Sequence, residues 1–389
     1  MKKILIINTK YRIFGGEDSN ISDEINLLSK FYDVRYLEFD NSKSFSFNDL
    51  FSFFIGKNIK SNNLLKRAIK EFNPDIAYVH NLWFKGQVGI FNLLKLYNIP
   101  TVHKIHNFRY FCCNSILIKK HLNNQKQCFM CGMKIQKNKI FNSYYFNSKT
   151  KSLLLILFTK KYLKYLKNNK ILLFALNEFH KQKLIDIGIC EEKIFVFFNP
   201  ISTLELGNYN YNPKSNYVVY AGRIEENKGI EELLDSWSKF ESKEIKLKII
   251  GDGNLKDIIQ KNYRKIKNIE FLGLLSNEET KKWIQGARAV LTTTKLYEGH
   301  PKLLAEASSL GVPSIYPSFG GMNEYFPKNY ELSFEQFNYN DFIKKLNKVY
   351  DTSLMESLGQ QVFDKTLEIL SEETLVNKFK NITNLKINE

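Results

Sequence analysis

Short runs of β-branched and aromatic residues recur along the first half of the chain, and segments with helical spacing separate most of them. This alternation is typical of βαβ units, in which helices join parallel strands. The predicted strands of this series cover residues 3–8, 34–39, 76–81, 101–107, 172–177 and 194–199. A second series follows an Asn-rich segment at 208–216 that is typical of a linker. Its predicted strands cover residues 217–222, 246–252, 269–273, 289–294 and 312–317.

The two series predict two α/β domains of the Rossmann type, each with a mostly parallel sheet. We expect the first domain at residues 1–207 and the second at residues 208–365. Residues 366–389 have an amphipathic helical pattern, and we expect this helix to pack back on the first domain. A length of 389 residues also favours two domains. The hydrophobic fraction of 43% excludes a disordered or fibrous chain.

The formal charge of +17 is concentrated in the first half of the chain. Residues 1–200 hold 32 Lys and Arg against 14 Asp and Glu, whereas the remainder holds 25 against 26. Residues 76–177 contain 17 basic side chains and no acidic one. An anionic partner is expected for this stretch. The first residues, MKKILIINTK, enter a strand pattern directly and lack the features of a signal peptide, which predicts a cytoplasmic protein.

The most informative stretch of the second domain is AGRIEENKGIEELLDSW at 221–237. A strand ends in a glycine here, and Arg223 and Lys228 follow before a helix begins. Two cations on one strand-to-helix loop can converge on a dianion such as a diphosphate. The alternative interpretation is a solvated loop with ordinary basic residues, and the motif alone favours neither.

A second motif at 292–315 places Glu298 and Glu306 on either side of a glycine, a histidine and a proline. Pro301 suits the first residue of a helix, so that Glu306 falls on the second helical turn. Free amides at the helix start, from residues such as Lys302 and Leu303, would attract phosphate, and the carboxylates would accept hydrogen bonds from hydroxyl groups. A sugar nucleotide carries both kinds of group. The alternative is one capping and one surface glutamate.

These motifs resemble those of the family 4 retaining glycosyltransferases, the group 1 type with the GT-B fold, in which two Rossmann-like domains face a central cleft. The resemblance covers nearly the whole chain. It rests on the segments YRIFGGED (11–18), AGRIEENKG (221–229), IIGDGN (249–254), FLG (271–273), the Glu298–Glu306 element and GGMNE (320–324).

The resemblance implies roles for several residues. Arg223 and Lys228 would bind the donor diphosphate, Glu298 would contact the transferred sugar, and Glu306 would bind the ribose. Charge grows on the leaving nucleoside diphosphate, so cations and helix starts placed there would stabilise the transition state. Backbone groups near Gly273 and Leu274 would recognise the base. The full set of expected donor-binding residues is Gly15, Gly16, Arg223, Lys228, Gly273, Leu274, Glu298, Gly299, His300, Pro301, Lys302, Leu303 and Glu306.

The first domain offers a glycine loop and a histidine. Gly15 and Gly16 precede Asp18 and Ser19, which are predicted helix N-caps, and small residues there would let the backbone approach a phosphate or an acceptor hydroxyl. An ordinary β-to-α turn is the alternative. His106 matches a histidine that related enzymes place near the donor sugar. His80 and His103 compete with it, but His106 lies at the carboxyl edge of its strand, where α/β proteins bind ligands.

Catalysis is thus expected to depend on His106, Glu298, Arg223 and Lys228. The sequence contains no Asp-x-Asp element for a divalent metal, so we expect no required cofactor and no catalytic metal. Four cysteines, Cys112, Cys113, Cys128 and Cys131, include a C-x2-C pair and are zinc candidates. A complete site would need both adjacent cysteines or His121, so reduced structural thiols are favoured over zinc.

Residues 151–170 combine an apolar run too short to span a bilayer with six lysines. The segment predicts either peripheral attachment to an anionic membrane or a buried helix with a solvated lysine face. The missing carboxylates favour the membrane, or an acceptor linked to a polyprenyl diphosphate.

The sequence therefore predicts a cytoplasmic glycosyltransferase, peripheral at the inner face of the membrane. It would move a sugar from a nucleotide diphosphate donor, a UDP-sugar being favoured, to a lipid-linked or other glycan acceptor in cell-surface polysaccharide synthesis. One alternative is a non-catalytic donor-binding relative on the membrane. A basic nucleic-acid-binding protein is the other, but it leaves Glu298, Glu306 and the glycine loops unexplained, so no nucleic-acid partner is expected.

Overall fold

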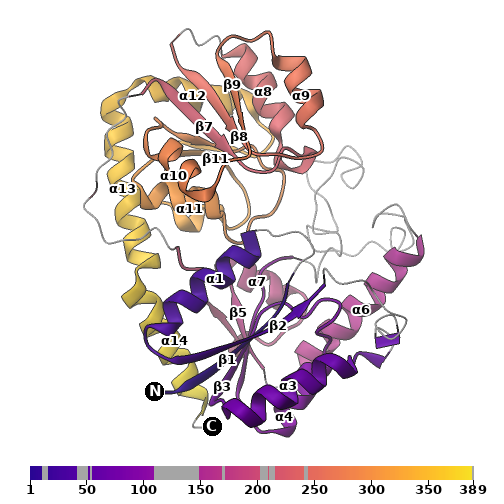
Figure 1. Cartoon of the computed structure of the whole chain (residues 1–389). Coiled ribbons are helices and arrows are strands. Elements are labelled where there is room, and N and C mark those ends of the chain that lie inside the picture. Colours follow the sequence, from indigo (N-terminus) through magenta and orange to yellow (C-terminus); the bar gives the residue numbers. More distant parts are fainter. Residues whose placement is uncertain are drawn as a thin grey trace. The chain divides into compact units, whose positions relative to one another are not determined.

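The computed structural model describes residues 1–10, 16–41, 51–52, 55–108, 149–168, 171–201, 209, 215–240 and 244–387 (Figure 1). The chain divides into two compact units. Among the described residues, unit 1 comprises those up to Pro200 together with those from Glu372 onward, and unit 2 comprises those between Ile201 and Ser371.

Unit 1 contains, within the described residues, a six-stranded parallel sheet in the order β2-β1-β3-β4-β5-β6. Its strands are β1 (Lys3–Lys10), β2 (Asp33–Asp40), β3 (Ile76–Val79), β4 (Thr101–Lys104), β5 (Leu172–Ala175) and β6 (Ile194–Val196). Its helices are α1 (Gly16–Ser29), α3 (Ile59–Phe72), α4 (Gly89–Leu96), α6 (Lys149–Asn168), α7 (Glu178–Asp186) and α14 (Glu372–Ile387), with the short 3-10 helix η2 (Glu191–Lys193). Strands such as β1 are buried on both faces, which explains their continuous apolar sequence.

The two faces of the unit 1 sheet are covered by different helices. Alternate strand positions such as Ile4, Ile6 and Tyr78 pack with residues of α1 and α14. On the opposite face, His103 of β4 contacts Phe91 of α4 and Tyr162 of α6. The parity of a residue within its strand therefore decides which helices surround it.

Helix α14, the last helix of the chain, completes the core of unit 1. Phe379 is fully buried, and its ring lies 5.5 Å from that of Tyr78 and 5.8 Å from that of Phe197. Lys2 Nζ also donates a hydrogen bond of 2.8 Å to Asn384 Oδ1. The long helix before it, α13 (Thr352–Leu370), belongs to unit 2, so the chain changes units at Ser371.

Unit 2 contains a second parallel sheet, with six described strands in the order β12-β11-β10-β7-β8-β9. The strands are β7 (Tyr217–Ala221), β8 (Lys246–Ile250), β9 (Ile269–Gly273), β10 (Val290–Leu291), β11 (Ser314–Ser318) and β12 (Ser333–Glu335). The helices besides α13 are α8 (Ile230–Lys239), α9 (Lys256–Tyr263), α10 (Asn277–Gln285), α11 (Lys302–Ser309) and α12 (Tyr339–Asn347). Short 3-10 helices are η3 (Glu226–Lys228), η4 (Met322–Tyr325) and η5 (Lys348–Tyr350).

Local sequence signals explain several element ends. Asn58 caps α3 by accepting a hydrogen bond from the Ser61 amide, and Asn73 ends the helix in the left-handed conformation. Ser276 and Glu279 form a reciprocal capping box at the start of α10. The two predicted Rossmann-like sheets are confirmed, and each of the eleven predicted strands is present. The three-residue strand β12 was not predicted.

Two histidines are part of the unit 1 core. Val79 O lies 3.0 Å from Nδ1 of His103, and burial lowers the pKa of His103 to about 4. His180 lies in the first turn of α7, where Asn177 caps the helix by accepting its amide at 2.7 Å. Burial lowers the pKa of His180 to about 3. Both rings therefore stay neutral in the folded chain at pH values where an unfolded histidine binds a proton.

Replacing His180 with leucine should make the stability of the protein less dependent on pH. Below a pH of about 6.5 the unfolded chain protonates this histidine, whereas the folded chain does not until about 3, so acid destabilises the native protein across this window. His180→Leu should remove up to about 1.4 kcal/mol per pH unit from the slope of the unfolding free energy. Urea denaturation between about pH 7 and about pH 5 measures this slope. Parallel curves for both proteins would contradict the assignment.

Candidate functional site

The strand order of unit 2 places the loops after β7 and β10 beside each other. β7 pairs with β10 on one side and with β8 on the other. After β7 the chain continues to β8, whereas after β10 it continues to β11 on the opposite side, so the order of the strands reverses between β7 and β10. In open α/β sheets, ligands bind outside the carboxyl ends of the strands at such a switch point. The AGRIEENKG loop follows β7, and the TTTKLYEGHPK segment follows β10. Two motifs that are distant in sequence are thus neighbours in the fold.

A glycine allows the two loops to make backbone contact. Gly229 has a φ of +71°, and a Cβ atom there would lie 2.1 Å from the carbonyl oxygen of Thr293. Thr293 Oγ1 donates a hydrogen bond of 2.7 Å to the Gly229 carbonyl, and the Lys295 amide donates to Asn227 O at 3.0 Å. The loops therefore fit together only because residue 229 lacks a side chain.

The segment after β8 supports the same loop from its other side. The Ile224 amide donates to the Asp252 carbonyl at 2.9 Å, and a Cβ atom on Gly253 would lie 2.3 Å from the Ile224 carbonyl oxygen. The IIGDGN segment lies so close to this loop that residue 253 must be glycine. The segment thereby positions the loop that carries Arg223 and Lys228.

Lys228 and Glu298 meet at this edge of the sheet although they are 70 positions apart. Lys228 Nζ lies 2.7 Å from Glu298 Oε1, and Thr294 Oγ1 donates to the same oxygen at 3.3 Å. The two charged side chains are 24% and 21% exposed, so water still reaches both. A lysine and a carboxylate predicted to act on one ligand are therefore in direct contact.

Arg223 lies on the same loop but has a different partner. Its Nη1 is 3.0 Å from the carboxylate of Glu225, and its side chain is 61% exposed. Its carbonyl accepts a hydrogen bond of 2.9 Å from the hydroxyl of Tyr220. Burial raises the pKa of Tyr220, and the charges of Arg223, Glu225 and Glu298 all act on it. Arg223, Glu225 and Glu298 therefore all lie near Tyr220. No direct contact joins Arg223 to Lys228.

The start of α11 differs in two details from the prediction. Pro301 lies immediately before the helix rather than at its first residue. The Lys302 amide, predicted to be free, donates to the His300 carbonyl at 2.9 Å. The residue types in this segment did not predict this backbone hydrogen bond. The Leu303 amide remains in the first turn, where the helix itself provides no acceptor.

Tyr325 of η4 anchors the residues before this helix. Its hydroxyl donates a hydrogen bond of 3.1 Å to the Gly299 carbonyl and lies 3.0 Å from His300 Nδ1. One hydroxyl can donate once and accept as well, so His300 is held with its Nδ1 proton toward the tyrosine. The segment between Glu298 and α11 is thereby fixed.

The remaining donor-binding candidates of unit 2 lie near the same sheet edge. Glu306 is on the second turn of α11 as predicted, is only 7% exposed and lies 3.9 Å from Lys302 Nζ. Gly273 ends β9 with a φ of +75° and accepts the Gly251 amide at 2.8 Å. Leu274 next to it is 75% exposed.

In unit 1, the glycine loop is only partly described. Gly15 lies outside the described residues, and Gly16 is the first residue of α1. The prediction that Asp18 and Ser19 cap this helix was wrong, because the helix begins earlier and both residues lie in its first turn.

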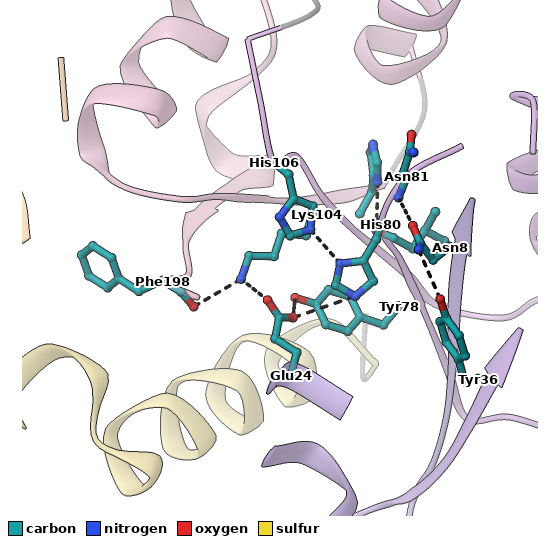
Figure 2. Close-up of polar contacts among 11 residues, drawn as sticks. Asn8, Glu24, Tyr36, Tyr78, His80, Asn81, Lys104, His106 and Phe198 are labelled. Atoms are coloured by element: carbon teal, nitrogen blue, oxygen red, sulfur yellow. Dashed lines mark hydrogen bonds and ion pairs between the residues drawn. The ribbon is translucent and has the colours of Figure 1, made fainter. Parts of the chain in front are cut away.

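His106 contacts one of its two competitors directly (Figure 2). Its Nε2 lies 2.8 Å from Nδ1 of His80, and the two rings are stacked with centroids 5.1 Å apart. His80 Nε2 in turn lies 3.9 Å from Glu24 Oε2. His103 belongs to the opposite face of the sheet, where it contacts Tyr162 and Phe91.

Glu24 of α1 is the centre of this buried cluster. Lys104 Nζ donates to its Oε1 and also, at 3.2 Å, to the Phe198 carbonyl, while the Tyr78 hydroxyl donates to its Oε2 at 2.6 Å. Burial raises the pKa of Glu24 and lowers that of Lys104, and their contact opposes both shifts. Burial also lowers the pKa of His80 and of His106 well below the usual range.

The described part of α6 has a buried face and an exposed lysine face. Phe158, Tyr162 and Leu166 follow helical spacing and are buried, with Trp83 packed against the first two. Lys160 and Lys164 are exposed. Among the described residues this agrees with the alternative of a buried helix with solvated lysines. None of the helices described here combines the length and hydrophobicity needed to span a bilayer.

The zinc candidates Cys112, Cys113, Cys128 and Cys131, together with His121, lie outside the described residues. Within the described part of the chain, no three His, Cys, Asp or Glu side chains are arranged to hold a metal ion.

Comparison with known proteins identifies the second unit. The family described as Glycosyl transferases group 1 matches residues 205–362, which include Arg223, Lys228, Glu298 and Glu306. Residues 205–362 therefore form a domain that matches the group 1 glycosyl transferases.

Two curated relatives match parts of the chain. The amylovoran biosynthesis glycosyltransferase AmsD of Erwinia amylovora is 30% identical over 102 residues, which are 26% of this chain and 29% of the relative. The lipopolysaccharide 1,6-galactosyltransferase of Escherichia coli (strain K12) is 31% identical over 144 residues, which are 35% and 39% of the two chains. The matches thus span well under half of either relative.

A solved structure resembles the whole chain. Anabaena HepE in complex with UDP and glucose has a TM-score of 0.66 and 13% identity, and the match covers 99% of this chain and 100% of HepE. At this identity the likeness establishes the fold alone. The GT-B fold expected from the sequence is confirmed, and the family expected from the sequence is the one whose model matches residues 205–362.

Several residues that surround the candidates in unit 1 were not found by motif. Glu24 is three positions from Ile21 and four from Leu28, so helical spacing places this carboxylate on the apolar face of α1. Lys104 is a buried residue of the central parallel strand β4. A charge in either position is a detectable signal of a buried polar network.

Gly229→Ala should destabilise this glycosyl transferase domain more than Gly273→Ala does. Both glycines have a positive φ near 70°, which costs a residue with a Cβ about 1–2 kcal/mol. Only at Gly229 would the Cβ also collide with a carbonyl oxygen, whereas nothing lies within 4 Å at Gly273. Chemical denaturation of both variants measures the difference. Equal losses would show that the contact with Thr293 does not constrain the loop.

Proposed function

We propose that this chain transfers a sugar, with retention, from a nucleoside diphosphate sugar to a hydroxyl group of a membrane-linked glycan precursor. The donor is a UDP-sugar, and the product is part of a cell-surface polysaccharide. The observation that carries the proposal is the contact of Lys228 with Glu298 at the switch point of a group 1 domain. Cation and carboxylate are the two kinds of group that a sugar nucleotide requires there.

In this proposal, Lys228 and Arg223 bind the donor diphosphate. Lys228 is only partly exposed, and Arg223 reaches solvent with most of its side chain. A diphosphate supplies the negative charge that Glu298 and Glu225 now supply to them, and it also accepts hydrogen bonds from amides such as that of Leu303. The cations would then stabilise the charge that develops on the leaving group.

The two glutamates would bind hydroxyl groups of the donor. Glu298 beside Lys228 would contact the transferred sugar, and the buried Glu306 on α11 would accept hydrogen bonds from the ribose. Retention would follow from attack on the same face as the leaving group. The proposal assigns no pair of carboxylates of the kind that retaining glycosidases use.

The comparisons support the choice of donor and pathway. HepE was solved with UDP and glucose, and the two curated relatives are a glycosyltransferase of amylovoran biosynthesis and a lipopolysaccharide galactosyltransferase. A UDP-sugar donor and a cell-surface glycan acceptor agree with all three. A thermal-shift panel of UDP, GDP and ADP with their sugars would identify the base.

Lys228→Met should weaken binding of UDP and of UDP-glucose. Loss of a hydrogen bond to a charged phosphate costs about 1.5–3 kcal/mol, or roughly tenfold to 150-fold in affinity. Glu306→Ala should weaken UDP binding through the ribose. Isothermal titration calorimetry of both variants measures these losses.

Lys348→Met provides the matched control, because it breaks another lysine–glutamate pair of unit 2, with Glu331 at 2.5 Å. It should bind UDP like the wild type. Unchanged UDP affinity in both Lys228→Met and Glu306→Ala would refute the site. Donor binding without turnover in the presence of glycan acceptors would instead identify a non-catalytic relative.

We also propose that the lysine face of α6 attaches the protein to an anionic membrane surface. The described half of the helix buries Phe158, Tyr162 and Leu166 within unit 1, so attachment would use Lys160 and Lys164 rather than these apolar side chains. Each basic residue near an anionic surface contributes about 1 kcal/mol. The interaction should therefore weaken as salt is raised.

Reversing two of these charges should release the protein from anionic vesicles. Lys160→Glu combined with Lys164→Glu changes the helix face by four charges, and sedimentation with vesicles of phosphatidylserine and phosphatidylcholine should fall at least about tenfold. The matched control reverses Lys261 and Lys265 of unit 2, which have the same spacing and are also exposed. If the control loses binding equally, or the wild type does not sediment at low salt, the attachment site is wrong.

A further inference from the structure

The buried cluster of unit 1 is built from residues of equal parity on two neighbouring strands and their extensions. Tyr78 and His80 are two positions apart in β3 and its extension, and Lys104 and His106 are two positions apart in β4 and its extension. All four lie on the face of the sheet that α1 covers, where Glu24 lies beside Tyr78, His80 and Lys104, and His106 contacts His80 (Figure 2). The cluster extends from the interior to the carboxyl edge of the sheet.

The carboxylate of Glu24 determines which atoms carry protons in this cluster. Lys104 donates to Oε1 and Tyr78 to Oε2, so both oxygens already act as acceptors. His80 Nε2 is the next polar atom, 3.9 Å from Oε2. A carboxylate at this distance favours a proton on the nitrogen that faces it. The tautomer of His80 that this carboxylate stabilises has a proton at Nε2 and a lone pair at Nδ1.

The hydrogen bond between the histidines then fixes the second ring. Nδ1 of His80 and Nε2 of His106 are 2.8 Å apart, and two lone pairs cannot meet at that distance. His106 must donate from Nε2, which leaves its Nδ1 without a proton. This Nδ1 is buried and has no hydrogen-bond partner among the described residues. A buried acceptor of this kind indicates a hydroxyl or amide donor that comes from a ligand.

Burial, together with the charge of Lys104, keeps both histidine rings neutral. Burial disfavours the imidazolium form of each, and the ammonium of Lys104 adds to this effect. The other groups that act on His106 are His80, His103 and His180, which are also buried rings. His106 is thus suited to accept a hydrogen bond rather than to offer a positive charge to a diphosphate.

We propose that Glu24 and His80 are positioning residues that hold His106 in the Nε2-protonated tautomer, so that its Nδ1 accepts a hydrogen bond from a sugar hydroxyl. The part of this inference that concerns the sugar rests on the proposed transferase function. The tautomer itself does not, and it can be measured without any substrate.

Nuclear magnetic resonance of the full chain with ¹⁵N-labelled histidine tests the tautomer. The His106 signals are assigned by their loss in His106→Asn. In the wild type, only Nε2 of His106 should carry a proton at neutral pH. His80→Leu and Glu24→Gln should abolish this single tautomer, whereas His80→Asn should keep it, because the asparagine Oδ1 replaces the acceptor at the position of Nδ1.

His103→Asn is the matched control, because it alters a buried histidine on β4 that faces the other side of the sheet. It should leave the His106 tautomer unchanged. A proton on Nδ1 of His106 in the wild type, or an unchanged tautomer in His80→Leu, would overturn the inference whether or not the protein is a transferase.

Binding and turnover with UDP-glucose test the part that concerns the sugar. His80→Leu should lower turnover roughly tenfold or more, His80→Asn should restore most of it, and affinity for UDP should not change. A parallel loss of UDP-glucose affinity would assign the hydroxyl to the donor sugar, and unchanged affinity would assign it to the acceptor. Wild-type turnover in His80→Leu would refute the role. Absence of turnover in the wild type would instead mark failure of the proposed function.

Discussion

Parallel strands present all of their carboxyl ends at one edge of the sheet, and this constraint places the candidate groups of both units. In unit 2 it brings the loop after β7 beside the loop after β10, so that Lys228 meets Glu298. In unit 1 it brings the residues that follow β3 beside those that follow β4, so that His80 meets His106. The same geometry thus produces a charged pair in one unit and a neutral pair in the other. Helix α1 accounts for part of the difference, because its residue Glu24 contacts Tyr78 and Lys104 in the second cluster.

The two pairs differ in how firmly they are held. Lys228 and Glu298 keep contact with water, and an ion pair of this kind contributes about 1 kcal/mol or less. In the proposed donor complex, a diphosphate would therefore replace Glu298 as the partner of Lys228 at little cost. Glu24 is 1% exposed, and an unpaired charge at such a site costs several kcal/mol. Lys104 and Tyr78 must stay bound to it, so the surroundings of His80 are fixed.

The sequence predicted the regular elements better than it predicted the contacts of individual side chains. Long apolar runs such as residues 3–8 are buried on both faces and predict a parallel strand. β12 has only three residues and no such run, so the sequence did not predict it. The Lys302 amide was expected to be free, but its partner is the carbonyl of His300, and a backbone turn leaves no trace in residue types. Strand parity is a further signal: His103 and His106 are three positions apart on one extended segment, so their side chains fall on opposite faces of the sheet. Gly15 and the four clustered cysteines lie outside the described residues, and their predicted roles stay predictions.

Positive charge is concentrated in the first half of the chain, but only the exposed basic residues there can attract an anionic partner. Residues 76–177 contain no carboxylate, yet Lys104 within them is neutralised by Glu24 from an earlier helix. This charge belongs to the core and cannot attract a membrane or a nucleic acid. Lys160 and Lys164 belong to the same stretch but lie on the exposed face of α6, four residues apart. The acid-free stretch therefore holds two kinds of lysine. Lys104 completes a buried network beside His80, whereas Lys160 and Lys164 form a basic helix face toward solvent. The proposed attachment to an anionic surface would depend on this second kind.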